Sequence, residues 1–200
     1  MYERKLKTPL SYNGEQYDTL TFDFDKLTGK DGIDIENELL TQADVVLYPI
    51  LSPEYMTRFI SKACNEPIGF DGFQQMNYLD YKPIFDQATE CLKNYGEIQT
   101  DGYVTTYTFK APITYGETTY KEMSFDFMRL TVQDTIEADR AMRNASSVFV
   151  MVKDYNAEYA INIAARCCNE RVDAGFFRAL PYPDYEAIRR AVRDFLTQQE

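Results

Sequence analysis

The chain has 200 residues, of which 44% are hydrophobic, and it carries a formal net charge of −11 and no histidine. The apolar content supports a folded core and excludes general disorder, while the acidic balance disfavours nucleic-acid binding, which needs clustered Lys and Arg. Without histidine, neither a Ser-His or Cys-His triad nor a histidine zinc site can form. Catalysis by carboxylates alone stays possible in principle, but we expect a protein that is not an enzyme and that uses no cofactor or metal.

The lack of a recognisable targeting signal and the spacing of the cysteines predict a cytoplasmic protein. No run of about 18 apolar residues predicts a membrane helix, and the first ten residues lack the apolar stretch of a secretory signal. The four cysteines, Cys64, Cys91, Cys167 and Cys168, show no CxxC spacing. This pattern favours buried, reduced thiols.

The first predicted elements are two strands. Residues 5–12 alternate between apolar and polar positions, and Leu20, Phe22 and Phe24 continue this period of two, which is typical of half-buried strands. The Asn13-Gly14 pair between them is a strong hairpin-turn signal, because both residues tolerate a positive φ. The chain therefore opens with a predicted β-hairpin.

Three helices are predicted after the hairpin. Thr28 is a candidate N-cap for a helix that ends near Leu40, and Ser52-Pro53 begins a second helix. A short connection, GFDGFQQM at residues 69–76, leads to a last helix that begins near Asp80. The unit is an α+β module, a β-hairpin followed by about three helices.

The same pattern recurs about 103 residues later. Between residues 7–31 and 110–134, ten of twenty-five positions are identical. After one inserted residue the shift becomes 104, and the remaining matches include Cys64-Asn65-Glu66 with Cys168-Asn169-Glu170, Phe73 with Phe177, and Tyr78 and Tyr81 with Tyr182 and Tyr185. We interpret this as a tandem duplication, with one copy at residues 1–97 and the other at 98–200.

How the two copies meet stays open in the sequence. A lone hairpin is marginally stable in water, so we hypothesise that the two hairpins join in one four-stranded antiparallel sheet. The segment around Gly96–Gly102 could either hold the copies together tightly or let them swing.

Three motifs invite a chemical interpretation. Asp23 and Asp25 lie on one strand face and could share a cation, but Met128 replaces Asp25 in the second copy, which favours a solvated strand face. Cys167 and Cys168 would point about 100° apart on a helix, which suits neither chelation nor a disulfide. The DKLTGKDG stretch at residues 25–32 lacks the GxxxxGK[ST] spacing of a phosphate loop.

The sixteen tyrosines and thirteen phenylalanines are the most unusual feature. Phe70, Phe73, Phe176 and Phe177 lie in the connection before the last helix of each copy. Aromatic side chains there either fill the core beneath a loop or form a recognition surface. These four are our candidate partner-binding residues, and we predict no catalytic, cofactor-binding or metal-binding residue.

The stretch KAPITYGETTYKEMSFDFMRLTVQDTIEADR at residues 110–140, with PYPDYEAIRRAV at 181–192, resembles the tail assembly chaperones of tailed bacteriophages and prophages. The first copy keeps Pro9, Tyr12, Leu27, Thr28, Asp31, Asp80 and Tyr81 of this pattern. Members of that family usually carry one copy, so the doubling is a departure. The two copies could replace a homodimer or another oligomer contact, as an internal pseudo-dimer.

The resemblance implies a non-enzymatic helper in the cytoplasm of a bacterial host. Such chaperones bind the tape-measure protein, whose long helical chain exposes apolar stripes before the tail tube encloses it. A helix-in-groove contact would cover those stripes. Two alternatives are a structural or adaptor component of a phage particle and an acidic DNA-mimic inhibitor. The mimic would need carboxylates spaced like phosphates along one face.

Overall fold

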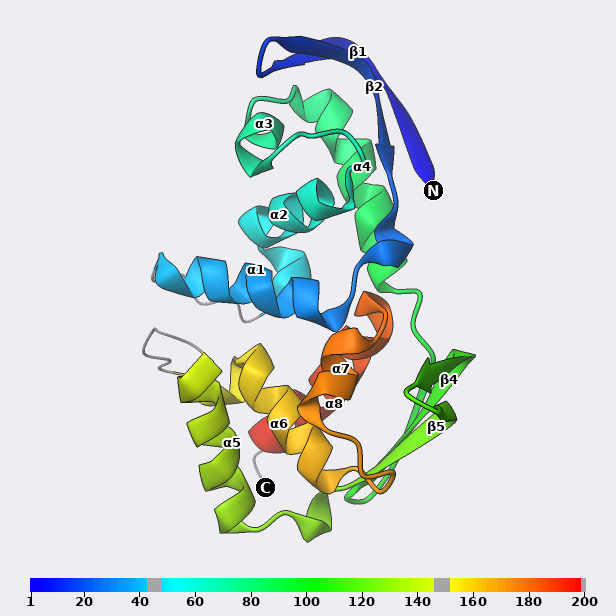
Figure 1. The fold of residues 1–200 in the computed structure, drawn as a ribbon, viewed down its shortest axis with the longest axis vertical. Helices are drawn as coiled ribbons and strands as arrows, with labels where there is room; N and C mark the ends of the chain where they lie inside the picture. The colour runs from blue at the N-terminus through cyan, green and yellow to red at the C-terminus, as the bar shows by residue number, and fades with distance from the viewer. Residues whose placement is uncertain (43–47, 146–151, 199–200) are drawn as a thin grey trace.

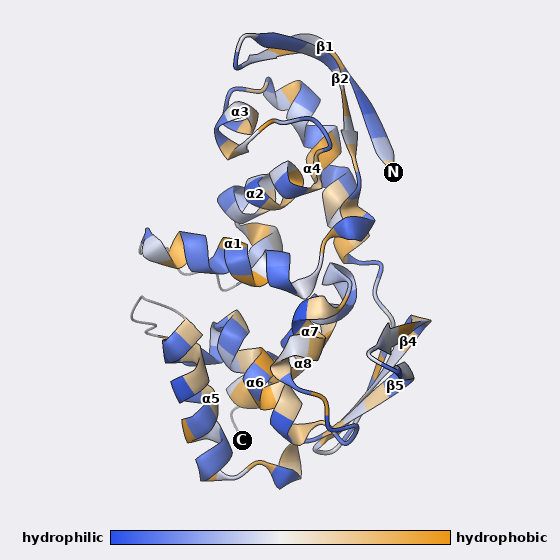
Figure 2. Cartoon of the chain, viewed as in Figure 1, coloured by the Kyte–Doolittle hydropathy of each residue, from blue (hydrophilic) through white to orange (hydrophobic). Residues whose placement is uncertain are grey.

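The computed structural model describes residues 1–42, 48–145 and 152–198. The molecule is elongated, and its two halves lie one above the other along the long axis (Figure 1). Hydrophobic residues gather where the helices of each half face one another (Figure 2). The predicted α+β class is confirmed.

The first half begins with a two-stranded sheet. Its elements, in chain order, are β1 (Tyr2–Tyr12), β2 (Glu15–Phe22), η1 (Phe24–Lys26), α1 (Gly29–Thr41), η2 (Pro49–Leu51), α2 (Pro53–Ala63), α3 (Phe70–Gln74) and α4 (Tyr78–Leu92). The turn between β1 and β2 has positive φ at Asn13 and Gly14, as the hairpin signal predicts.

The second half has the same order of elements after one additional strand. Its elements are β3 (Glu97–Asp101), β4 (Val104–Tyr115), β5 (Thr118–Asp126), η3 (Phe127–Arg129), α5 (Val132–Ala145), η4 (Lys153–Tyr155), α6 (Ala157–Cys167), α7 (Ala174–Ala179) and α8 (Tyr182–Thr197). The boundary that the sequence suggests, between residues 97 and 98, falls at the start of β3. The duplication itself stays an interpretation of the sequence.

Two details differ from the expected module. The connections before the last helices each contain a short helix, α3 or α7. The segment around Gly96–Gly102, which the sequence left open as a hinge, forms β3 and pairs with β4 in antiparallel register from Glu97↔Thr108 to Asp101↔Val104. Strand pairing therefore ties this segment to the second half.

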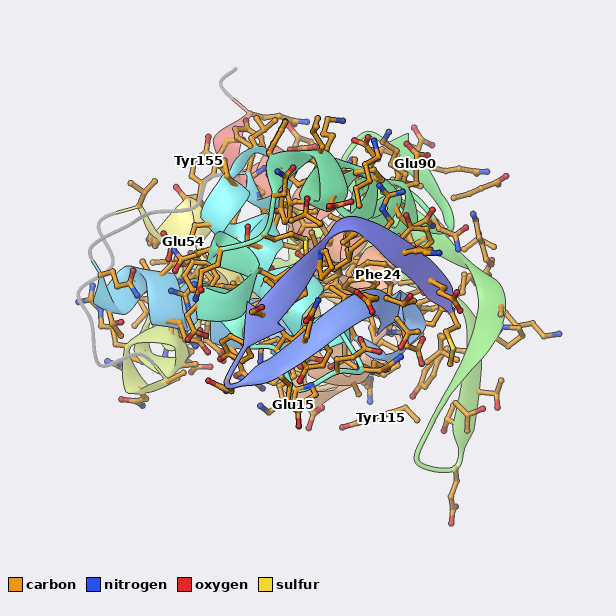
Figure 3. The ribbon with its side chains drawn as sticks, turned by 90° about the horizontal axis from the view of Figure 1, so that it is seen from above. Glu15, Phe24, Glu54, Glu90, Tyr115 and Tyr155 are labelled. Carbon is orange, nitrogen blue, oxygen red and sulfur yellow. The ribbon has the colours of Figure 1, made fainter. Side chains whose placement is uncertain are left out.

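The hypothesis of one joint sheet is wrong. The strands form two separate sheets, in the orders β1-β2 and β3-β4-β5. Seen from above, β1 and β2 cross the helices of their own half, with Phe24 beneath, while β4 and β5 lie apart from them (Figure 3). Each hairpin packs on its own helices instead, through isolated bridges between Phe22 and Cys64 and between Phe125 and Cys168.

The Cys-Asn-Glu sequence explains how each hairpin is anchored. Glu66 accepts hydrogen bonds from the Thr21 N–H and hydroxyl at 2.9 and 2.8 Å. In the second half, Glu170 accepts from the Ser124 N–H at 3.1 Å. The backbone N–H of Asn65 donates to the Thr21 carbonyl at 2.9 Å. A carboxylate at the end of α2 or α6 thus satisfies a strand donor that would otherwise be unpaired.

A break in the β1–β2 register creates a second anchor. The ladder shifts between Lys5 and Leu10, which frees the N–H groups of Lys7 and Thr8. Both donate to the buried Asp80 carboxylate of α4, at 2.8 and 3.0 Å. Burial tends to raise the pKa of Asp80, but these hydrogen bonds and the nearby Arg4 guanidinium outweigh burial and hold the pKa below its ordinary value.

The two halves meet where α1 packs on the second half. A short antiparallel bridge joins Thr28 and Pro181: the Gly29 N–H donates to the Leu180 carbonyl and the Tyr182 N–H donates to the Leu27 carbonyl, both at 2.9 Å. A Cβ atom on Gly32 would lie 2.3 Å from the Tyr182 ring. Only a glycine lets α1 approach this ring so closely.

A buried ion pair completes this contact. The Arg189 guanidinium donates to the Glu36 carboxylate at 2.6 Å, and both side chains are almost fully buried. Glu36 also accepts from the Ala157 N–H at 2.7 Å, while Arg189 donates to the Tyr155 carbonyl at 2.6 Å. Next to the pair, the Tyr55 and Tyr182 hydroxyls share a hydrogen bond of 2.7 Å. Every charge brought into this interface therefore has a partner.

Replacing Glu36 by leucine should destabilise the protein by about 3–5 kcal/mol, because it leaves the Arg189 charge buried without its carboxylate. The double variant Glu36→Leu/Arg189→Met should lose less than the sum of the two single variants, because the second substitution removes the guanidinium that the first leaves without Glu36, although Glu186 then loses its 3.5 Å contact with Arg189. Urea unfolding measures both free energies. A double variant that loses as much as the sum of the two single variants would contradict a coupled pair.

Asp80→Asn should lower the free energy of unfolding at pH 7 by about 1–3 kcal/mol, because hydrogen bonds to a charged group are weakened. The folded-state pKa of Asp80 lies below its ordinary value of 3.8. Asp80 therefore makes its full contribution to the free energy of unfolding above pH 3.8. This contribution is lost as the pH falls through the lower pKa of the folded state. Urea unfolding at pH 7, 5 and 3 should show the difference from wild type shrinking at pH 3.

The matched control is Asp86→Asn, which removes an exposed carboxylate of the same helix that pairs with Lys82 four residues away. We expect a change within about 0.5 kcal/mol at every pH. An Asp80→Asn effect of the same size at pH 7 and pH 3 would refute the role of the carboxylate charge.

Candidate partner-binding surfaces

A groove of about 350 Å³ lies at the junction of the two halves. We call it the junction groove. It is lined by Tyr48, Pro49, Leu92, Lys93, Tyr95, Tyr182, Glu186, Arg190 and Arg193. These residues come from the start of η2, the end of α4 and one face of α8, so the groove exists only where the halves are held together.

Aromatic rings and guanidinium groups are stacked along this groove. The Arg193 guanidinium carbon lies 4.8 Å from the centre of the Tyr48 ring, and that of Arg190 lies 5.5 Å from the centre of Tyr95. Tyr48 also packs edge-on against Tyr155, with 6.3 Å between the ring centres. Stacking of this kind holds long arginine side chains in place. The buried Arg193 guanidinium also donates to Asp194 at 3.1 Å, whereas Arg190 is only half-buried.

Basic side chains outnumber acidic ones in the lining of the junction groove, although Lys93 pairs with Glu90 and Arg193 with Asp194 just outside it. Lys93, Arg190 and Arg193 line it together with a single carboxylate, that of Glu186. Tyr48 remains 46% exposed at its edge. Tyrosine and arginine are the residue types that carry most of the energy at protein–protein contacts, so the groove is suited to an apolar segment with acidic flanks.

A second opening lies in the first half, between α2, α3 and α4. We call it the α3–α4 pocket. It has a volume of about 330 Å³ and is lined by Pro53, Glu54, Thr57, Phe70, Phe73, Gln74, Met76, Tyr78 and Tyr81. Tyr78 is 66% exposed at its rim. The pocket is more aliphatic and aromatic than charged.

The four predicted partner-binding residues have different positions. Phe73, Phe176 and Phe177 are buried in the core, and Phe176 packs edge-on against Tyr115 and Tyr120 of the β4–β5 hairpin. Phe70 is half-buried on the wall of the α3–α4 pocket, with the Arg58 guanidinium 4.2 Å from its ring centre. Partner binding by these residues stays a prediction, and three of them lie beneath the surface.

The residues of the junction groove were missed by the sequence analysis. Tyr48 and Tyr95 stand out in no motif, and Arg190 lies inside the helix PYPDYEAIRRAV, where it reads as a solvated position. Their common signal appears only when η2, α4 and α8 are brought together.

The vicinal cysteines, one of the motifs with a possible chemical role, lie in the interior of the second half. Within residues 1–42, 48–145 and 152–198, no three His, Cys, Asp or Glu side chains gather as metal ligands. The vicinal pair Cys167 and Cys168 is unbridged and buried. Burial, together with the hydrogen bond to Glu170, raises the pKa of the Cys168 thiol to about 12. Burial and the hydrogen bond to Glu66 likewise raise the pKa of the Cys64 thiol to about 12.

Comparison with known proteins assigns the second half. A family model described as "Phage tail assembly chaperone proteins, E, or 41 or 14" matches residues 106–197. Over this range the chain is similar to the phage tail assembly chaperone family. No curated protein and no solved structure matches the chain.

The family match confirms the resemblance that residues 110–140 and 181–192 carry, and it extends from β4 to the end of α8. It supports a role for the chain in phage tail assembly. Arg190 and Arg193 of the junction groove lie in the range that the family model matches, whereas Tyr48 and Tyr95 come from the residues before it. No helix in the described part of the chain has the length and apolar character needed to cross a membrane.

The cysteines should react in a fixed order. At pH 8, Cys64 and Cys168 should react with a disulfide reagent on the order of a thousandfold more slowly than a free thiol, because a pKa near 12 leaves almost no thiolate. Cys91 is only half-buried and should react first. Absorbance of the released thiol measures the rates, Cys91→Ser identifies the fast phase, and labelling in urea should reach all four. Free-thiol rates at Cys64 or Cys168 would contradict their burial.

Proposed function

We propose that this protein is a non-enzymatic chaperone that binds the tape-measure protein in the host cytoplasm during tail assembly. The family match over residues 106–197 is the observation that carries the proposal. The junction groove is the surface that we assign to this partner, because it combines the exposed Tyr48 ring with the half-buried Tyr95 and Arg190.

The chemistry of the groove suits an amphipathic helix. A long helical chain that waits to be enclosed exposes an apolar stripe, and stripes of that kind aggregate. Tyr48, Leu92 and Tyr95 can cover apolar side chains of the helix, while Arg190 and Lys93 can pair with acidic residues at its edge. The same groove would reject a strongly basic helix.

The charge of the whole chain supports a chaperone role. A formal charge of −11 favours the solubility of this chain and so helps it keep a covered apolar segment in solution. The negative net charge also disfavours nucleic acid as a partner. The basic residues of the groove are too few to neutralise a phosphate backbone.

The proposal is tested by co-expression with a tape-measure protein of a tailed bacteriophage. Wild-type protein should keep the tape-measure chain soluble and elute with it. Arg190→Glu combined with Tyr48→Ala should weaken the complex at least about tenfold, because both residues offer groove contacts. Lys121→Glu, a matched charge reversal on the exposed face of β5, should leave binding unchanged.

Thermal unfolding by circular dichroism controls for folding of each variant. Wild-type protein that forms no complex at micromolar concentrations would overturn the proposal. Mass spectrometry of purified tails distinguishes a chaperone from the main alternative, a structural or adaptor component. A chaperone should be missing from the tails, whereas a structural or adaptor component should be present.

A further inference from the structure

The contact between the two halves joins two different surfaces. One partner is a face of α1 with Gly29, Gly32, Ile33 and Glu36, whose spacing places them on one side of the helix. The other partner is the surface formed by the start of α6 with α7 and α8. Since each half has the same order of elements, each should carry a counterpart of both surfaces. One counterpart in each half is left unoccupied.

The unoccupied helix face lies on α5. At the shift of 103, Gly29, Ile33 and Glu36 of α1 correspond to Val132, Ile136 and Asp139 of α5. The α1 residues are buried against the second half, whereas Val132 is 77% exposed and Ile136 is 40% exposed. Two apolar side chains thus stand in water on the face that α1 uses for docking.

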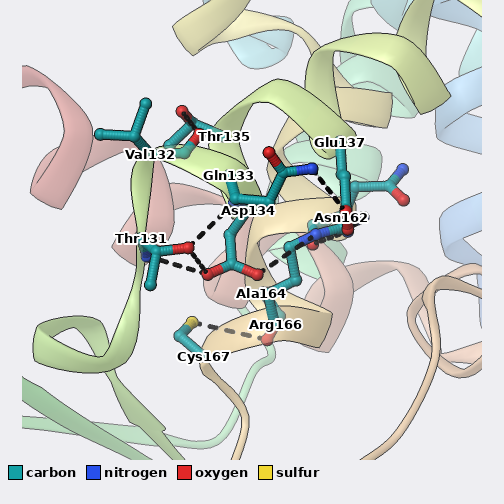
Figure 4. A network of polar contacts seen from close by, with 10 residues as sticks. All are labelled: Thr131, Val132, Gln133, Asp134, Thr135, Glu137, Asn162, Ala164, Arg166 and Cys167. Carbon is teal, nitrogen blue, oxygen red and sulfur yellow. Dashed lines mark hydrogen bonds and ion pairs between the residues drawn. The ribbon is translucent and has the colours of Figure 1, made fainter.

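Helices α1 and α5 begin with the same N-terminal hydrogen bonds. The Thr131 N–H donates to Asp134 at 2.8 Å, as the Thr28 N–H does to Asp31 at 2.9 Å. Arg166 of α6 then pairs with Asp134 and Glu137 of α5 (Figure 4). In Figure 4 the Val132 side chain points away from this network. The attachment to α6 therefore leaves the docking face of α5 free.

The unoccupied receiving surface is the α3–α4 pocket. In the second half, α1 meets Ala157, Phe177, Leu180, Tyr182 and Tyr185. At the shift of 104, these correspond to Pro53, Phe73, Met76, Tyr78 and Tyr81, and all five line the α3–α4 pocket. Tyr182 is fully buried beneath α1, whereas Tyr78 is open to solvent.

We propose that α5 of one chain docks into the α3–α4 pocket of a second copy, so that the protein associates head to tail. The proposal rests on repetition of the interface inside the chain and not on tape-measure binding. Because the two surfaces differ, each copy keeps one free surface after pairing, and association continues to a closed ring or an open filament.

The contact between chains should be looser than the contact within the chain. Val132 and Thr135 replace Gly29 and Gly32, so α5 cannot approach its partner as closely as α1 does. Asp139 of α5 occupies the position equivalent to Glu36, and Phe85 of α4 occupies the position equivalent to Arg189, so the buried ion pair has no counterpart in this contact. The open pocket leaves room for the larger side chains, and the contact becomes mainly apolar. We therefore expect reversible association that depends on protein concentration.

Sedimentation of the purified full-length protein tests the proposal. The average mass should rise above the 23.3 kDa of one chain as the concentration increases through the micromolar range. Val132→Asp on α5 and Tyr78→Lys in the pocket should each keep the chain monomeric. Tyr103→Lys, a matched change at an exposed tyrosine that precedes β4, should not alter association. Circular dichroism checks that each variant is folded.

A mixture of the two variants is decisive. Val132→Asp keeps an intact pocket and Tyr78→Lys keeps an intact α5 face, so together they should form a one-to-one complex that grows no further. Three results would overturn the proposal: a wild-type chain that stays monomeric, association that Tyr78→Lys leaves unchanged, or a pair of variants that do not complement. A monomeric wild type whose tape-measure binding is lost in Tyr78→Lys would assign the pocket to that partner instead.

Discussion

The packing of α1 on the second half is the contact on which the rest of the structure depends. It joins residues from both halves through a buried ion pair, a bridge of backbone hydrogen bonds and two glycines that admit tyrosine rings. Helix α8 carries Tyr182 and Arg189 into this contact and presents Arg190 and Arg193 to the junction groove. The groove is therefore a consequence of the interface, and a change that loosens α1 should also open or deform the groove.

The buried pair of Glu36 and Arg189 gives this interface specificity more than strength. Burial raises the pKa of Glu36, although the Arg189 guanidinium and the Ala157 N–H oppose this effect. A pair of this kind can be close to neutral in net stability, yet it penalises any arrangement that leaves one charge alone. It selects one placement of α1 on the second half among others that apolar contacts alone would allow.

Equivalent positions of the two halves have diverged where their surroundings differ. Asp80 accepts the strand N–H groups of Lys7 and Thr8, and its pKa is lowered. Its counterpart Asp184 instead accepts from the Tyr107 hydroxyl, and burial raises its pKa. Tyr107 stands where the first half has Arg4. A shared framework thus holds one carboxylate in a charged setting and the other in an apolar one.

Several features of the fold were predictable because they depend on residues close in the sequence. The Asn13-Gly14 turn, the Thr28 cap and the alternation along β2 each involve partners within a few positions. The α+β class was also predicted from the sequence, and the resemblance to tail assembly chaperones was visible in its motifs. The role of the Cys-Asn-Glu sequence did not follow from the alignment, since its partners lie about 45 positions away on a strand.

The tertiary structure alone decided how the halves meet and where the open surfaces lie. Glu36 and Arg189 are 153 positions apart, and no local pattern marks them as a pair. Each hairpin packs on its own half because Asp80, Glu66 and Glu170 accept hydrogen bonds from strand N–H groups there. Pairing the two hairpins in one sheet would give these N–H groups no additional partners. Alternation and spacing determine which face of an element is apolar, but the burial of that face depends on what packs against it. That is why the equivalent faces of α1 and α5 have opposite exposure.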